Sequence, residues 1–178
     1  GTTIMSYGFT CGTDDYFETN IPFTGPILQF HAASLAQAIA YMANPNPGYG
    51  NCYAPTVTTN HVPVVTVPGS YTIPKSTPFA LTGSATDEDN DVLSFCWEGT
   101  NIGTITPDVN TLADLTQPPF FRSYGLVDSS GPTRNYPLLA RILDGTNYAK
   151  GDKLPSVGIV TTHRLTVRDN NAQGGGVS

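Results

Sequence analysis

Proline and glycine interrupt this chain so often that long regular elements cannot form over most of its length. The 178 residues include 15 prolines and 18 glycines, spread from one end to the other. Proline fixes its own φ and donates no backbone hydrogen bond, and glycine costs backbone entropy inside helices and strands. Charged residues, which are abundant on long surface helices, make up only 12% of the chain. These properties favour short strands joined by tight turns, so the sequence predicts a mainly β protein.

One segment near the start has a helical pattern. Residues 29–42 (QFHAASLAQAIAYM) are rich in alanine, the best helix former, and carry apolar side chains such as Ile39 and Met42 at three- or four-residue spacing. His31 or Ser34 is expected to begin this helix, and the prolines that follow are expected to end it. A helix this short needs a partner surface to be stable in water.

From residue 54 onward the pattern changes to short β segments. The runs expected to form strands, because they alternate or are rich in β-branched residues, are 62–67, 71–73, 79–83, 92–98 and 158–168. In one of them the alternation places Leu93, Phe95 and Trp97 on the same face. Short strands separated by turn signals, with a tryptophan inside a strand, predict an antiparallel Ig-like β-sandwich.

The proline-rich stretch 99–157 lacks this rhythm. A structureless loop of that length is unusual in a compact domain, so we expect a long ordered insertion. A short helical piece is predicted at 138–143. The aromatic residues expected to pack on the sandwich are Phe120, Phe121, Tyr124, Tyr136 and Tyr148.

Charge and hydropathy exclude two classes of partner. The formal net charge is -6, and the eight lysines and arginines are scattered singly. A nucleic-acid-binding surface needs clustered basic residues, so we expect no nucleic-acid partner. No run approaches the ~20 apolar residues of a membrane span. No secretory signal follows Gly1, and we expect the chain to begin after processing or inside a longer protein.

Three cysteines allow one disulfide and one remaining thiol. Cys11 and Cys52 lie beside glycine or asparagine in turn-like contexts, where a bridge would close a loop. Cys96 lies in a strand pattern, so we expect it to be a small buried hydrophobic residue.

Residues 3–7 (TIMSY), followed by Cys11 and Gly12, resemble the Met-turn of the metzincin metallopeptidases. Residues 14–17 (DDYF) and 30–39 (FHAASLAQAI) extend this likeness to the end of the catalytic domain in bacterial reprolysin-like peptidases. In those proteins a helix follows the Met-turn and a cysteine follows the helix, a place that Cys52 would occupy. The second part is similar to the Ig-like domain that follows such enzymes, on the segments 71–74, 79–87, 96–98 and 164–170.

The resemblance implies a C-terminal fragment of a secreted, extracellular zinc metalloendopeptidase. Residues 1–53 would be the last segment of its catalytic domain, and residues 54–178 would be an Ig-like accessory domain that lacks its last strand. Met5, Ser6 and Tyr7 would form the hydrophobic Met-turn support beneath the zinc.

The zinc ligands themselves are expected outside this chain. A catalytic zinc needs three protein ligands and an open position for water. Metzincins supply the ligands from HExxHxxGxxH, and this sequence contains no such motif: its histidines are His31, His61 and His163, far apart in the chain. The fragment is therefore expected to be inactive alone. Its partners would be the remainder of the catalytic domain and, in the parent, peptide or protein substrates.

The densest acidic cluster has two interpretations. Asp87, Asp89 and Asp91 alternate along one loop, and carboxylates arranged in this way can converge on calcium. The other interpretation is an exposed turn between two strands, stabilised by bonds from Asp and Asn side chains to the backbone.

A second function class remains open beside the peptidase. Residues 169–176 form a turn pattern after a strong strand, and the sandwich is expected to be left with an open sheet edge. On this hypothesis the chain is an extracellular structural or adhesive β-sandwich module that self-associates through that edge, with or without stabilisation by calcium.

Overall fold

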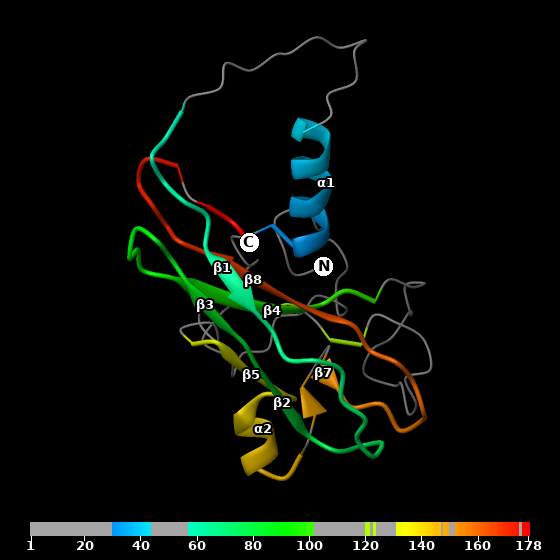
Figure 1. Ribbon diagram of the computed structural model, residues 1–178. Coiled ribbons are helices and arrows are strands. Elements are labelled where there is room, and N and C mark those ends of the chain that lie inside the picture. The colour runs from blue at the N-terminus through cyan, green and yellow to red at the C-terminus, as the bar shows by residue number, and fades with distance from the viewer. Residues whose placement is uncertain are drawn as a thin grey trace, which may run out of the picture.

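A computed structural model describes residues 30–43, 57–101, 120–121, 123, 131–146, 148–149, 152–174 and 176–178. Within these residues the chain forms eight short strands and two helices (Figure 1). Every strand pair is antiparallel. The mainly β, antiparallel class that the sequence predicts is confirmed.

The helix α1 (Ala32–Ala43) is the one predicted from residues 29–42, and it begins slightly later than the pattern indicates. The Nδ1 atom of His31 lies 3.1 Å from the backbone N–H of Ala33, which it accepts, so His31 caps the helix as expected. Within α1 only Ala32 is buried. Figure 1 shows why: the first turn of α1 lies close to the strands, and the rest of the helix extends away from them.

Two strand pairs share one long, nearly continuous strand. The strand β1 (Val64–Thr66) pairs with β3 (Ser84–Thr86), and β2 (Phe79–Thr82) pairs with β5 (Thr133–Tyr136). Only Gly83 separates β2 from β3. The β3 part of this strand therefore pairs with a segment that precedes it in the sequence, and the β2 part pairs with a strand of the insertion.

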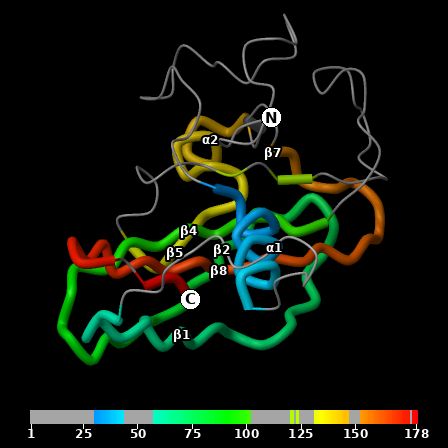
Figure 2. Tube along the Cα trace, turned by 90° about the horizontal axis from the view of Figure 1, so that it is seen from above, coloured from blue at the N-terminus to red at the C-terminus, as the bar shows by residue number. Residues whose placement is uncertain are grey.

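The third pair joins β4 (Ser94–Gly99) to β8 (His163–Arg168), and its register places Trp97 opposite Leu165. After β8 the chain turns back, and Val177 forms an antiparallel bridge with Arg168. The turn expected at 169–176 is therefore present. In the view from above, β1 runs along the outside of the assembly, with β8 on its inner side (Figure 2).

The insertion supplies the remaining short elements. The helix α2 (Leu139–Leu143) confirms the helix predicted at 138–143. The strands β6 (Tyr148–Ala149) and β7 (Asp152–Lys153) form a small hairpin. Phe121 forms a bridge with Asp152, so the hairpin is held against the first part of the insertion.

The first hydrophobic cluster lies between the β4–β8 pair and the strands β1, β2 and β3. Its buried members are Trp97, Leu165 and Val167, and the partly buried residues around them are Val65, Leu81, Ala85, Leu93 and Phe95. The predicted shared face of β4 is therefore confirmed. Gly83 lies directly over this cluster: a Cβ atom built there would collide with the Leu165 side chain and lie 3.1 Å from the carbonyl oxygen of Thr66.

The second cluster joins the insertion to β2. Phe120, Phe121 and Tyr136 are buried, with Phe79, Leu81 and Ile159 packed against them. The rings of Phe79 and Tyr136 stack at 4.7 Å between centroids. The expectation that aromatic residues of the insertion pack on the strands is confirmed for these three. Tyr124 and the side chain of Tyr148 lie outside the described residues.

Two strand predictions are wrong in detail. Residues 71–73 form no strand, and Tyr71 and Ile73 remain 68% and 44% exposed. Prolines on both sides of this run restrict its backbone, and β-branched composition cannot replace a missing partner strand. The last strand begins at His163, well after residue 158.

Candidate functional site

The acidic loop between β3 and β4 is a compact turn held by its own side chains. The Oδ1 atom of Asp87 accepts the backbone N–H groups of Asp89 at 3.0 Å and Asp91 at 3.1 Å. Asn90 takes a left-handed φ of 59°, which asparagine tolerates better than most residues. The predicted turn stabilised by Asp side chains is confirmed.

The same turn brings three carboxylates together. Asp87, Asp89 and Asp91 each place an oxygen within 4.8 Å of the others. The Oδ2 atom of Asp87 is inaccessible to solvent and accepts no hydrogen bond. Among the residues that the structure describes, this is the only group of three such side chains close enough to share a metal ion. A cluster of carboxylate oxygens is the donor set that calcium prefers.

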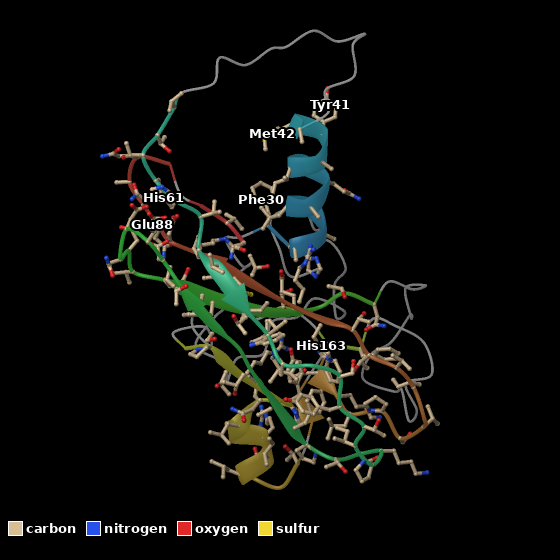
Figure 3. The ribbon with its side chains drawn as sticks, in the orientation of Figure 1. Phe30, Tyr41, Met42, His61, Glu88 and His163 are labelled. Atoms are coloured by element: carbon tan, nitrogen blue, oxygen red, sulfur yellow. The ribbon has the colours of Figure 1, made fainter. Side chains whose placement is uncertain are left out.

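Two residues distant in the sequence complete the surroundings of this loop. His61 donates its backbone N–H to Asp89 at 2.7 Å, and its Nδ1 lies 3.1 Å from the other Asp89 oxygen. Asn171 donates its side-chain N–H to Asp91 at 2.8 Å. Figure 3 shows His61 beside Glu88 at this end of the molecule.

Contacts at the loop shift the pKa values of His61 and Asp89 in opposite directions. The hydrogen bond to Asp89 and the nearby Glu88 raise the pKa of His61 above its usual value. The hydrogen bonds from His61 lower the pKa of Asp89. Near neutral pH, Asp89 is therefore ionised, as a cation ligand must be.

Asp169 holds the turn after β8. Its carboxylate is 1% exposed, and it accepts hydrogen bonds from Asn60 at 2.7 Å, from Asn171 at 3.1 Å and from the N–H of Gly176. Burial disfavours the charged form, but these hydrogen bonds outweigh it and lower the pKa of Asp169. The same carboxylate thus fixes both the segment before β1 and the returning end of the chain.

A second buried carboxylate attaches α1 to the sheet. Glu98 is fully buried in β4, and it accepts the N–H of Ala32 at 2.7 Å and the hydroxyl of Ser123 at 2.5 Å. The Nε2 atom of His31 lies 3.9 Å from the same carboxylate. A negative charge at the first N–H groups of a helix is favourable because those groups have no partner within the helix.

This cluster does not have the arrangement of a hydrolytic triad. In such a triad the histidine accepts the serine proton, and the carboxylate orients the far side of the imidazole. Here Glu98 lies between Ser123 and His31, and the hydroxyl of Ser123 donates to the carboxylate. The cluster anchors α1. Its hydrogen bonds do not activate Ser123, because the Ser123 hydroxyl is bonded to the carboxylate and not to the histidine.

His163 is the third histidine, and its environment keeps it neutral. Its Nδ1 lies 3.2 Å from the Tyr136 hydroxyl, and its ring contacts Phe79 and Phe121 in the second cluster. Burial, together with the nearby guanidinium of Arg134, lowers its pKa to about 4. The group therefore packs and orients its neighbours at neutral pH and carries no charge there.

Comparisons with protein-family models, with curated proteins and with solved structures found no match to this chain. No helix in the described residues has both the length and the apolar character needed to cross a membrane.

Most of the residues that the peptidase resemblance singles out lie outside the described part of the chain. These are the Met-turn residues Met5, Ser6 and Tyr7 and the predicted disulfide partners Cys11 and Cys52. The remaining cysteine, Cys96, is a buried thiol, as its strand pattern predicts.

The sequence predicts the three aspartates of the loop but not the residues around them. His61 and Asn171 reach the loop from segments that no spacing rule connects to it. The burial of Glu98 could have been predicted from its strand, because the residues before it are apolar on one face and small on the other. A carboxylate at such a position must be paired if it is buried.

Proposed function

We propose that this chain is the C-terminal part of a secreted, reprolysin-like zinc metallopeptidase. Residues 1–53 are the last segment of the catalytic domain, and residues 54–178 are an Ig-like β-sandwich accessory domain. The two functional parts have different roles. The first completes the floor of the active site, and the second is non-catalytic.

The observation that carries this proposal is the exposed apolar surface of α1. Ile39 and Met42, three residues apart on one side of the helix, are 49% and 57% exposed. Figure 3 shows Tyr41 and Met42 at the end of the helix farthest from the strands. An isolated helix of this length is marginal in water, so its stability depends on a surface that covers the apolar side. In the proposed parent, the remainder of the catalytic domain supplies that surface.

The attachment at Glu98 supports the same arrangement. It fixes the first turn of α1 to β4 while leaving the later turns uncovered. A helix that belonged only to the β unit would be expected to lie along it and bury its apolar side. The geometry instead suits a helix shared between two bodies.

In the parent, zinc would supply Lewis-acid activation of water from ligands on the absent HExxHxxGxxH helix. Within this chain, Met5 and its neighbours Ser6 and Tyr7 would support that centre without ligating it. The described residues take no part in the chemistry.

The experiment joins this chain to its upstream coding sequence and tests the surface of α1. Ile39→Asp in the joined protein is expected to reduce peptidase activity and the melting temperature, because a charge would enter the domain contact. Gln37→Asp, on the opposite side of the helix, serves as the matched control and should leave both unchanged. Upstream sequence without HExxHxxGxxH, or equal behaviour of the two variants, would count against the proposal.

The acidic loop favours a second candidate function, an extracellular module stabilised by calcium. Its support is the convergence of Asp87, Asp89 and Asp91 within 4.8 Å and the unpartnered oxygen of Asp87. Calcium binding would offset the mutual repulsion of these carboxylates and raise the stability of the β3–β4 connection.

A thermal melt with added CaCl₂, and again with a chelator, tests this candidate. The expected result is a higher melting temperature in calcium, lost in Asp91→Asn. Glu88→Gln is the control, because Glu88 lies in the same loop but outside the converging group. A melting temperature that calcium leaves unchanged excludes this function.

A further inference from the structure

Two loops form an open cavity beside the second hydrophobic cluster. One loop joins β1 to β2, the other joins β7 to β8, and Figure 1 shows them next to each other. The cavity has a volume of about 110 Å³ and opens to solvent on one side. An enclosed apolar cavity of about 150 Å³ in another protein holds one benzene ring. The space here therefore suits a single ring, with the rest of the ligand at the mouth.

The lining of the cavity is mainly apolar and aromatic. Phe121 and Leu154 line it and are buried. Phe79 lines it as well, and its ring packs edge to face on that of Phe121, with 5.9 Å between centroids. Ile73, from the run that forms no strand, is also part of the lining. An aromatic ligand would gain free energy by leaving water for this surface.

Hydrogen bonds hold the two loops together at the rim, so the cavity exists before a ligand binds. The backbone N–H of Ser76 donates to the carbonyl of Pro155 at 2.9 Å and joins one loop to the other. Ser76 has a left-handed φ of 57°. A residue with a side chain keeps such a conformation only where its surroundings hold it, and these residues cluster at ligand sites. In the second loop, Oγ1 of Thr161 lies 3.1 Å from Nε2 of His163 and ties the lining to β8.

The charge at the rim indicates the charge of the ligand. Lys75 is the only charged residue among the described residues that line the cavity. It makes no ion pair with any other described residue. Its long, flexible stem allows the ammonium group to reach over the mouth. The cavity therefore favours an anionic group outside its apolar interior, although the whole chain has a net charge of -6.

We propose that this cavity binds a small carboxylate that carries an aromatic ring. The ring lies against Phe79 and Phe121, and the carboxylate stays at the mouth, where the ammonium of Lys75 and the hydroxyl of Ser76 are available as donors. This inference depends neither on the peptidase parentage nor on calcium at the acidic loop.

Phenylacetate is the probe, and phenylacetamide is its neutral counterpart of the same shape. Both are titrated into the full chain, and the NMR shifts of the methyl groups of Ile73, Leu154 and Val157 are followed. Phenylacetate should give saturable shifts with a Kd of about 1 mM, as expected for a ligand of this size. Phenylacetamide should bind roughly 1.5- to 5-fold more weakly, the ratio expected for one exposed ion pair. About 0.5 M salt should reduce this difference.

Three variants separate the charge from the cavity. Lys75→Met keeps an apolar stem and removes the charge, so it should weaken phenylacetate roughly 1.5- to 5-fold and leave phenylacetamide unchanged. Arg141→Met, which removes a positive charge outside the lining, is the matched control and should leave both Kd values unchanged. Val157→Phe should fill the cavity and abolish binding of both probes. Val157 belongs to neither hydrophobic cluster, so this variant is expected to keep its fold, which its melting temperature checks.

Several results would overturn the proposal. The absence of saturable methyl shifts at about 20 mM phenylacetate, far above the expected Kd, would exclude the cavity as a ligand site. Shifts confined to methyl groups outside the lining would do the same. Equal affinity for the two probes, or equal weakening of both in Lys75→Met, would show that the site does not select a carboxylate.

Discussion

Gly83→Ala tests whether the close approach of the β2–β3 strand to β8 is essential for packing. The added Cβ would collide with the Cδ2 atom of Leu165 and lie 3.1 Å from the carbonyl oxygen of Thr66. The leucine end can move, but the backbone oxygen cannot do so without shifting β1. The substitution therefore overpacks the first cluster at a point where two layers of backbone meet.

The magnitude follows from two opposing effects. Overpacking a well-filled core costs ~1–3 kcal/mol. Replacing glycine by alanine also reduces the entropy of the unfolded chain, which stabilises the fold by ~0.4–1 kcal/mol. The net loss is about 1–2 kcal/mol, because the steric effect is the larger of the two. For a chain of this size it corresponds to a fall in Tm of about 2–8 °C.

Urea unfolding followed by Trp97 fluorescence measures the change. The control is Gly69→Ala, where a new Cβ would meet no atom within 4 Å. Adding Leu165→Val to Gly83→Ala removes the nearest colliding atom, so the double variant should lose less stability than the sum of the single variants. If Gly83→Ala and Gly69→Ala behaved alike, the assigned contact between the layers would be wrong.

Two further predictions concern the buried polar groups. Glu98→Ala should speed amide exchange in the first turn of α1, because it removes the acceptor of the Ala32 N–H, whereas Glu98→Gln should have a smaller effect; equal exchange in all three proteins would contradict the anchoring role. In an NMR titration, His163 should titrate at about pH 4 and His61 above 6.5. Because the folded pKa of His163 lies below that of the unfolded chain, its contribution to stability is complete above pH 6.5 and is lost as the pH falls toward 4. A midpoint near 6.5 for His163 would show that the aromatic cluster does not bury it.

Sequence patterns predicted the elements whose signal is local. The alanine-rich periodicity located α1, the alternation around Trp97 located β4, and the Asp-rich run located the turn before it. In each case the residues that define the element also stabilise it, so a short window of sequence contains the necessary information.

The same patterns could not supply long-range pairing. Residues 71–73 have strand-forming side chains but no partner, and partner availability is a property of the whole fold. The attachment of α1 through Glu98 depends on a contact between residues 66 positions apart. The hydrogen bonds from Asn60 to Asp169 and from Asn171 to Asp91 join residues 109 and 80 positions apart, so spacing could not reveal them. The Ig-like arrangement and the peptidase parentage stay predictions.

The insertion between β4 and β8 is a structural part of the fold, because it supplies core residues and a partner strand. Leu81 contacts both hydrophobic clusters, and β5 of the insertion is the only described partner of β2. The indole of Trp97 donates to the carbonyl of Pro132, and Arg134 donates back to the carbonyl of Trp97. Deleting this stretch would leave β2 without its described partner strand and would remove the acceptor of the Trp97 indole N–H. The β5 segment of the insertion is therefore required if both hydrophobic clusters are to remain covered.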